Sequence, residues 1–322
     1  ATYEIYDEDV TKRACDMLAG WGSGAERPFC MVVGFLLPHN PYVCSPDLFD
    51  EYMDRLPIRP DWETIEENSA VQALKASRTM ESITPEMARR SRAAYYGLVT
   101  TLDRNVGRIL DALDAAGLRE TTATMYTSDH GDLCGEHGLW CKDSFYDGSV
   151  RVPTIWSRPG VFGEGTTIEQ ATSLVDVAPT VTDLAGAESL PNVRGASLRS
   201  LLTGEEASAP PPPVFAETYA NTQRPARMVR RGAWKLCHYH GCEQPQLFNL
   251  ETDPEERCDL GGDDRHAAIR DELHALVLDG WDGGWIERCT EETAMTRRAA
   301  QQAPEGVAEV WDFPIGGNRR TE

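Results

Sequence analysis

The segment TATMYTSDHGDLCGEHGLWCK, residues 122–142, decides the fold of this chain. Four of its first six residues, Thr122 to Thr127, are of the β-branched and aromatic types that favour a strand. Asp129 and His130 follow almost at once, and then come glycines at positions 131, 135 and 138. The segment therefore predicts a strand whose carboxyl end opens into a glycine-rich loop.

Two elements upstream indicate how this strand is placed. Phe29 to Leu36 is a continuous apolar run of strand length, which is typical of parallel sheets covered on both faces. From Thr84 and Pro85 onward, apolar residues recur at spacings of three and four until Gly117, which predicts a long amphipathic helix. Strand, helix and strand in this order predict a parallel sheet with a right-handed crossover.

The remaining chain predicts shorter elements and one boundary. Four consecutive prolines within Ser208–Pro213 indicate a stiff linker, so we expect one unit over residues 1–207 and a second over 208–322. The second unit reads as an antiparallel meander with a helix and a polar tail. Residues 44–83 read as an irregular surface excursion. We also expect helices at 7–21, 176–185 and 266–278, and strands at 153–157, 214–217, 227–230, 233–237 and 246–249.

Composition limits the possible partners. The chain has 322 residues, with 31 basic and 52 acidic side chains and a net charge of −21, which disfavours nucleic acid. Its longest apolar run, Phe29 to Leu37, is shorter than the ~20 residues of a membrane helix, so we expect no membrane partner. The nine cysteines are an odd number in a chain of this length. They read as reduced thiols, which favours a cytoplasmic location.

The glycine-rich loop carries the residue types of a metal and anion site. Asp129 and His130 offer an oxygen and a nitrogen ligand to a divalent cation. Lys142, one of only four lysines, offers a compact positive charge to a sulfate or phosphate oxygen. The alternative for the Asp-His pair alone is a surface loop with incidental charges. The glycines, the lysine and the expected sheet edge together favour the site.

His39 is the third candidate residue. It stands in the run Pro38-His39-Asn40-Pro41, where two prolines hold the backbone rigidly. The expected topology places it at the same sheet edge as Asp129 and His130. A histidine has an ordinary pKa near 6.5 and can act as a general acid toward a leaving alkoxide. A purely structural histidine in a proline-rich turn is the alternative.

Several motifs, in the correct order, resemble those of the type I sulfatases of the alkaline-phosphatase superfamily, and the likeness covers nearly the whole chain. The motifs are Pro28-Phe29 through Tyr42, Leu102 to Gly107, Thr127 to Asp132, Gly135 to Lys142, Arg151-Val152-Pro153, Asp176 to Thr180, Arg227 to Leu236, Leu247 to Leu250 and Asp253-Pro254-Glu255. The resemblance implies an α/β sandwich of the alkaline-phosphatase type. Here it would comprise the C-terminal portion of the mixed sheet with flanking helices, followed by a small antiparallel C-terminal subdomain.

The resemblance also implies an activity, the metal-dependent hydrolysis of a small-molecule sulfate ester. Asp129 and His130 would then be metal ligands, and Lys142 would contact the sulfate. His39 would contact the ester oxygen and protonate the leaving group. The implied metal is calcium, with manganese or magnesium as alternatives.

The sequence departs from the family pattern at the nucleophile. The family makes a formylglycine from the Cys of a Cys-x-Pro-x-Arg motif, and none of the nine cysteines matches it. Cys44 has a proline at the right spacing but lacks the arginine and follows His39. The family's early pair of adjacent aspartates has no counterpart before residue 29. We therefore expect a sulfatase fragment with half of its metal site.

Three alternatives to this expectation remain open. The chain could be non-catalytic, or it could be completed by an N-terminal segment or form a homo-oligomer. It could also be a phosphonate or phosphodiester hydrolase of the same superfamily.

Two further patterns allow more than one interpretation. Phe29-Cys30, residues 144–149 and Trp311-Asp312-Phe313 look most like choline-sulfatases and their relatives. The aromatic residues at 140, 145 and 146 could bind a quaternary ammonium by cation–π contacts, although such residues more often pack a core. Cys237 to Cys242 has the residue types of a metal site, but a hairpin turn at Gly241 explains the run more simply.

Overall fold

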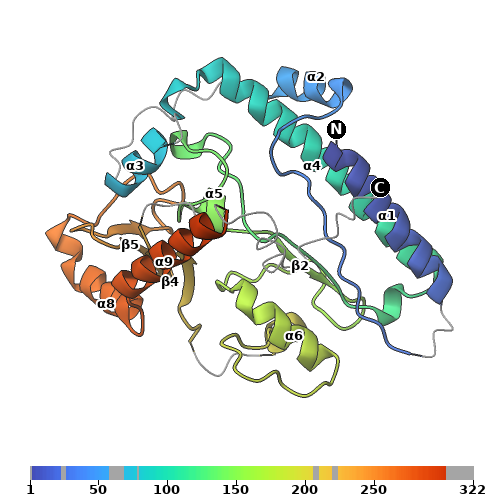
Figure 1. Cartoon of the computed structure of the whole chain (residues 1–322). Coiled ribbons are helices and arrows are strands. Elements are labelled where there is room, and N and C mark those ends of the chain that lie inside the picture. The colour runs from blue at the N-terminus through green and yellow to red at the C-terminus, as the bar shows by residue number, and fades with distance from the viewer. Residues whose placement is uncertain are drawn as a thin grey trace.

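The computed structural model describes residues 2–22, 27–57, 69–77, 80–205, 210–219 and 224–301. The helices are α1 (Thr2–Trp21), α2 (Pro46–Arg55), α3 (Ser69–Ser77), α4 (Pro85–Ala115), α5 (Asp147–Val150), α6 (Val177–Leu184), α7 (Arg199–Thr203), α8 (Ala267–Leu278) and α9 (Gly283–Gln301). The strands are β1 (Thr124–Thr127), β2 (Thr154–Ser157), β3 (Val214–Thr218), β4 (Ala226–Arg231), β5 (Trp234–Tyr239) and β6 (Gln246–Asn249). Figure 1 shows α1, α2 and α4 together on one side and the β3–β6 sheet on the other.

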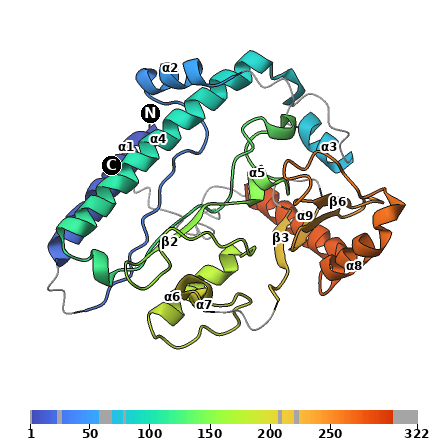
Figure 2. The ribbon, with the colours of Figure 1, turned by 180° about the vertical axis from the view of Figure 1, so that it is seen from behind.

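The long helix α4 begins and ends as the sequence predicts. The Thr84 hydroxyl accepts a hydrogen bond from the Met87 amide at 3.2 Å, and Pro85 occupies the first turn. Gly117 adopts a φ of 69° just beyond the helix. Apolar residues of α4 pack against α1, which runs beside α4 in both views of the ribbon (Figures 1 and 2). No helix of the described ranges is long and apolar enough to cross a membrane.

The expectation that residues 29–36 form a strand in a parallel sheet with β1 is wrong for the described residues. Residues 29–36 are extended but form no strand, and the Val32 side chain is 91% exposed. The amides of Leu36 and Leu37 instead donate to the Asp7 carboxylate of α1, at 2.9 and 3.0 Å. β1 pairs with β2 in antiparallel register, Thr124 opposite Ser157. The apolar pattern correctly indicated an extended backbone, but strand pairing depends on distant residues that the pattern does not reveal.

Two other expectations need correction. The expected irregular excursion over residues 44–83 contains α2 and α3, although residues 58–68 and 78–79 lie outside the described ranges. Pro46 stands in the first turn of α2, a position that proline favours. The expected polar tail begins with helix α9, while Trp311 to Phe313 lie outside the described ranges.

The predicted C-terminal meander is confirmed. β3, β4, β5 and β6 form one antiparallel sheet in that order. The predicted helix, observed as α8, packs on one face of it, where Leu273 and Val277 join Val229, Leu236 and Leu247 in a buried cluster. The linker prediction lies partly outside the described ranges, because residues 206–209 are not among them.

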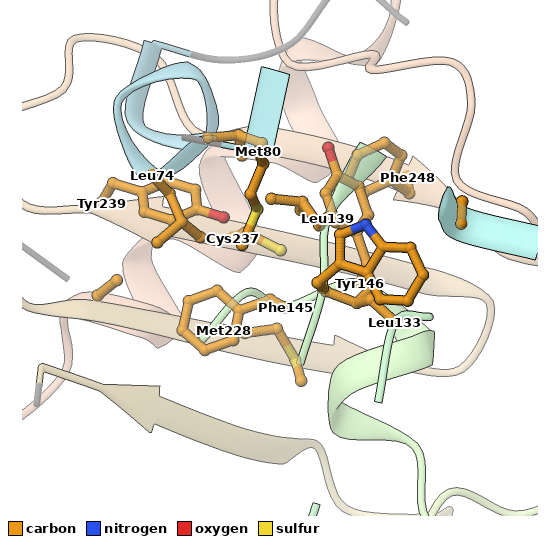
Figure 3. Packing of buried hydrophobic residues seen from close by; sticks show 14 residues of the cluster. Leu74, Met80, Leu133, Leu139, Phe145, Tyr146, Met228, Cys237, Tyr239 and Phe248 are labelled. Carbon is orange, nitrogen blue, oxygen red and sulfur yellow. The ribbon is translucent and has the colours of Figure 1, made fainter. Parts of the chain in front are cut away.

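Another apolar cluster joins this sheet to the segment after β1. Figure 3 shows Met228, Cys237, Tyr239 and Phe248 of the sheet against Phe145 and other residues of that segment, with Leu74 of α3 above them. The aromatic residues predicted either to pack a core or to bind a cation are buried here. The exposed fractions of Trp140, Phe145 and Tyr146 are 8, 2 and 3%. Core packing therefore explains all three.

Candidate functional site

Two loops distant in the sequence bring His39 and Lys142 together. His39 follows the extended segment 29–36, and its amide donates to the Leu36 carbonyl at 2.9 Å. Lys142 ends the glycine-rich loop that follows β1. The Lys142 Nζ lies 3.2 Å from the His39 Nε2, across 103 residues of sequence. The structure thus pairs two of the residues singled out from the sequence.

A local hydrogen bond determines which nitrogen of His39 faces Lys142. The His39 Nδ1 lies 2.7 Å from the Asn40 carbonyl oxygen. Because a carbonyl only accepts hydrogen bonds, Nδ1 carries the proton. In the neutral ring Nε2 then holds a lone pair and accepts from the Lys142 ammonium. This nitrogen is the one that would exchange a proton with a bound molecule.

His130 lies beside this pair, with its ring centroid 6.4 Å from that of His39. Its Nδ1 lies 2.8 Å from the Gly131 carbonyl oxygen, so the same reasoning leaves its Nε2 with a lone pair. The Asp129 Oδ2 is 3.5 Å from that Nε2. The Asp129 side chain is 84% exposed, so an oxygen and a nitrogen ligand stand close together at an open surface.

These two residues fit part of a metal site. Calcium takes six to eight oxygen ligands, whereas manganese also accepts imidazole nitrogen. Within the described ranges, no three His, Cys, Asp or Glu side chains converge on one point. Asp129 and His130 therefore offer two ligands, and the predicted metal stays a prediction.

Asp132 was not singled out from the sequence, although it organises the loop. Its Oδ1 accepts hydrogen bonds from the Cys134 and Cys141 amides, each at 3.1 Å. Its Oδ2 accepts from the Tyr42 hydroxyl at 2.6 Å. Burial and the neighbouring carboxylate raise the pKa of Tyr42, so this hydroxyl keeps its proton and remains a donor. One local signal could have indicated this role, because an aspartate often accepts a hydrogen bond from the backbone amide two residues later in a turn.

The glycines of the loop permit its close packing and its tight turns. A Cβ at Gly131 would lie 2.2 Å from the Gly148 carbonyl oxygen. The Gly131 amide donates to the Ser149 carbonyl at 2.7 Å, which fastens the loop to α5. Gly135 and Gly138 adopt φ values of 94° and 65°, which disfavour other residues. They fold the loop back toward Lys142.

His137, in the same loop, is held neutral. Its ring stacks on Tyr146, with centroids 3.8 Å apart and planes 7° apart. Burial and the positive charges of Lys75 and Lys235 together lower the pKa of His137 to about 4. The unprotonated ring is therefore a packing element at neutral pH.

A buried ion cluster supports α5, five residues beyond Lys142. The Lys235 Nζ of β5 lies 2.7 Å from Asp147 and 2.6 Å from Glu256. The Glu256 carboxylate also accepts the Asp147 amide at 2.5 Å. Burial alone would lower the pKa of Lys235, but the charges of Glu256 and Asp147 outweigh burial and raise it. Lys235 therefore stays charged inside the protein.

The cysteines supply no nucleophile of the predicted kind. None of the nine forms a disulfide. Cys44 packs against α4, where a Cβ on Gly97 would come within 2.5 Å of its Sγ, and burial raises the pKa of this thiol.

The predicted turn at Gly241, where φ is 75°, is confirmed. His238 contacts His274 at 3.0 Å rather than a cluster of ligands.

A cavity of about 1020 Å³ lies next to the residues that follow Lys142. Helix α3, Asp143 and Ser144, the turn between β5 and β6, and residues 257–262 line it. Ser144 is 4% exposed, and within the described ranges its hydroxyl has no hydrogen-bond partner. Arg224 and Arg257 also line the cavity, so it offers donors and acceptors to a polar molecule.

Comparison with known proteins gives the same family for both parts of the chain. A family model described as Sulfatase matches residues 1–187, and one described as N-sulphoglucosamine sulphohydrolase, C-terminal, matches residues 135–280. The choline-sulfatase of Rhizobium meliloti is 34% identical over 302 residues, which cover 89% of this chain and 58% of that protein. The chain spans about half the length of the curated relatives it matches.

Solved structures share the fold. The crystal structure of a sulfatase from Bacteroides thetaiotaomicron superposes with a TM-score of 0.75 at 25% identity, covering 87% of this chain and 64% of that one. A phosphonate monoester hydrolase from Silicibacter pomeroyi superposes with a TM-score of 0.72 at 26% identity, covering 84% and 58%. The expected α/β fold of the alkaline-phosphatase type is thereby confirmed.

Proposed function

Because this chain belongs to the sulfatase family, we propose that its site binds the sulfate group of an ester and assists hydrolysis of that ester. The observation that supports this proposal most is the 3.2 Å contact between Lys142 Nζ and His39 Nε2. It places a permanent positive charge and a titratable nitrogen at one point, beside the ring of His130.

Each member of the pair has its own task. The Lys142 ammonium neutralises a sulfate oxygen and holds it by a charge-assisted hydrogen bond. His39, protonated at Nε2, gives that proton to the oxygen of the departing alcohol, which leaves as a neutral molecule. The bond from Nδ1 to the Asn40 carbonyl fixes the ring so that Nε2 faces the same point as Lys142.

Asp129 and His130 would hold a divalent cation. The exposed Asp129 carboxylate and the Nε2 lone pair of His130 support this assignment, with calcium first and manganese or magnesium as alternatives. When bound, the cation would add positive charge next to the sulfate. Broadening of the His130 resonances by Mn²⁺, absent in Asp129→Ala, would support the assignment. Equal broadening in both proteins would remove Asp129 from it.

The nucleophile is a separate question. No cysteine of this sequence stands in the Cys-x-Pro-x-Arg pattern from which the family makes its formylglycine, so no residue of this chain is given that role. We propose that an N-terminal segment carrying that motif completes the site. The segment could belong to the same polypeptide or be supplied by a partner, including a partner in a homo-oligomer.

We also propose a cytoplasmic location, because an odd number of cysteines suggests reduced thiols in a reducing compartment.

The cavity beside Ser144 is proposed to receive the organic part of the ester. It begins at Asp143, the residue that follows Lys142. Arg224 and Arg257 line it and can donate hydrogen bonds to a polar group of a ligand. These features favour an alcohol with hydrogen-bonding groups over a purely apolar one.

A second candidate function is hydrolysis of phosphonate or phosphate esters. The superposition on a phosphonate monoester hydrolase favours it, because the two proteins share a fold at 26% identity. A lysine ammonium donates a hydrogen bond to a phosphonate oxygen as readily as to a sulfate oxygen. Only a direct comparison of the two anions separates the candidates.

The test measures binding, which needs no nucleophile. Calorimetric titration compares 4-nitrophenyl sulfate with 4-nitrophenyl phenylphosphonate on the purified chain, on Lys142→Ala and on Lys12→Ala, whose lysine is exposed on α1. We expect the sulfate to bind more tightly than the phosphonate, with sulfate binding weakened about tenfold in Lys142→Ala and unchanged in Lys12→Ala. Tighter binding of the phosphonate would favour the second candidate. Equal binding by the wild-type and Lys142→Ala proteins would refute the site.

A further inference from the structure

The two loops of the candidate site meet at one carboxylate. His39 precedes α4 in the sequence and Lys142 follows β1, and their mutual contact is a single hydrogen bond at an exposed position. Such a contact contributes little free energy by itself. The 3.2 Å separation therefore requires support from the residues behind the pair.

We propose that Asp132 is the positioning residue that holds His39 and Lys142 in contact. Its Oδ2 accepts from the hydroxyl of Tyr42, three residues after His39. Its Oδ1 accepts from the amide of Cys141, the residue immediately before Lys142. One side chain thus links the Tyr42 side chain of one loop to the backbone of the other. The role of the pair in sulfate binding rests on the proposed function, but the link itself does not.

Both ends of this link are rigid. The Tyr42 ring lies 5.8 Å from that of Tyr95 on α4 and 6.1 Å from that of Trp140. On the other side, Oδ1 also accepts the Cys134 amide, which closes the loop around the carboxylate. Because a side chain with so many acceptor bonds has little rotamer freedom, it transmits the position of one loop to the other.

The geometry distinguishes Asp132 from a residue needed only for its charge. Asparagine at this position keeps an oxygen for the two amides and can donate its NH₂ to the Tyr42 oxygen. Alanine removes every contact. Tyr42→Phe removes only the bond to Oδ2 and keeps the ring between its aromatic neighbours. The three variants therefore remove the contacts of Asp132 to different degrees.

The experiment observes the histidine ring itself and needs no turnover. Long-range proton–nitrogen correlation spectra are recorded at mildly alkaline pH, above the ordinary histidine pKa of about 6.5, with His39 assigned by its loss in His39→Gln. The Lys142→Met variant gives the nitrogen chemical shift of His39 Nε2 in the absence of the lysine ammonium. We expect Asp132→Ala to move the signal more than half of the way to that position. Tyr42→Phe should move it less, and Asp132→Asn should leave it near the wild-type position.

A matched control separates positioning from stability. Asp176 also joins two segments, accepting the Ser173 and Ala196 amides at 2.9 Å each. Asp176→Ala should lower the melting temperature without moving the His39 signal. The proposal is overturned if Asp132→Ala leaves His39 at the wild-type position, or if Asp176→Ala moves it equally. If Asp132→Ala does not fold, an unmoved signal in Tyr42→Phe overturns it. Failure of ester binding alone would refute the proposed function and not this link.

Discussion

At the scale of single residues, the neighbouring carbonyls of Asn40 and Gly131 determine which ring nitrogen carries the proton in His39 and His130. Each carbonyl accepts a hydrogen bond from Nδ1, which leaves Nε2 of the neutral ring with its lone pair. The tautomer thus follows from the backbone conformation next to each ring and needs no distant residue.

Lys142→Ala tests the charge at this site. A hydrogen bond to a charged group is worth ~1.5–3 kcal/mol, and the exposure of the contact places the value at the lower end. We expect about tenfold weaker binding of 4-nitrophenyl sulfate, with an unchanged melting temperature. Calorimetry and thermal unfolding provide the two measurements. Lys142→Arg should recover part of the loss, and an unfolded Lys142→Ala would show that the lysine is structural.

His137 gives a pH dependence of stability. Its pKa is about 4 in the folded protein against 6.5 ordinarily, so the unfolded chain binds more protons between these values. Stability is complete above the unfolded pKa and is lost as the pH falls through the folded one. The loss attributable to His137 is about 3 kcal/mol from pH 7 to about pH 4. Urea unfolding of wild type and of His137→Phe, which retains an aromatic ring opposite Tyr146, measures it. Parallel pH profiles would contradict the assignment.

At the scale of elements, the sequence predicts the ends of α4 and the antiparallel meander of β3–β6, but not what residues 29–36 bond to. Thr84, Pro85 and Gly117 define both ends of α4 because caps act within one turn. The apolar run 29–36 predicted a strand, yet its last amides bond to Asp7 of α1. Which groups satisfy an extended backbone depends on segments far along the chain, and one sequence does not show them.

The candidate site shows the same division. His39, Asp129, His130 and Lys142 stood out because their residue types suggest chemistry. Asp132 did not, because its role depends on Tyr42, which lies 90 residues away in the sequence. The function of a supporting residue lies in its contacts, and these appear only once the chain is folded.

The buried ion cluster predicts how strongly α5 depends on β5. Lys235→Met would leave the Glu256 carboxylate, 2% exposed, and that of Asp147 without their cation. Removing one partner of a buried pair costs ~3–5 kcal/mol. We expect a loss of that size in the free energy of unfolding by urea, and partial recovery in Lys235→Met with Glu256→Gln. Lys12→Met, at an exposed position, is the control. A loss under ~1 kcal/mol would mean that the cluster contributes little.

At the scale of the whole molecule, the net charge of −21 opposes the charge of the site. An anionic ester must approach a predominantly acidic surface before it meets Lys142. The distant acidic charges act over a Debye length of about 30 Å at 0.01 M salt, but only about 8 Å at 0.15 M. The contact at Lys142 is shorter than either length. Salt therefore screens the repulsion more than it screens the final contact.

We therefore expect the association rate constant of 4-nitrophenyl sulfate to rise a few-fold between about 10 and about 150 mM salt, the reverse of electrostatic steering. Stopped-flow tryptophan fluorescence measures it. A zwitterionic sulfate ester has no net charge to be repelled, so its rate constant should stay constant over the same range. A rate constant for the anionic ester that falls with salt would mean that the positive field of Lys142 outweighs the acidic surface at a distance. The site would then attract its anion from solution rather than only hold it on arrival.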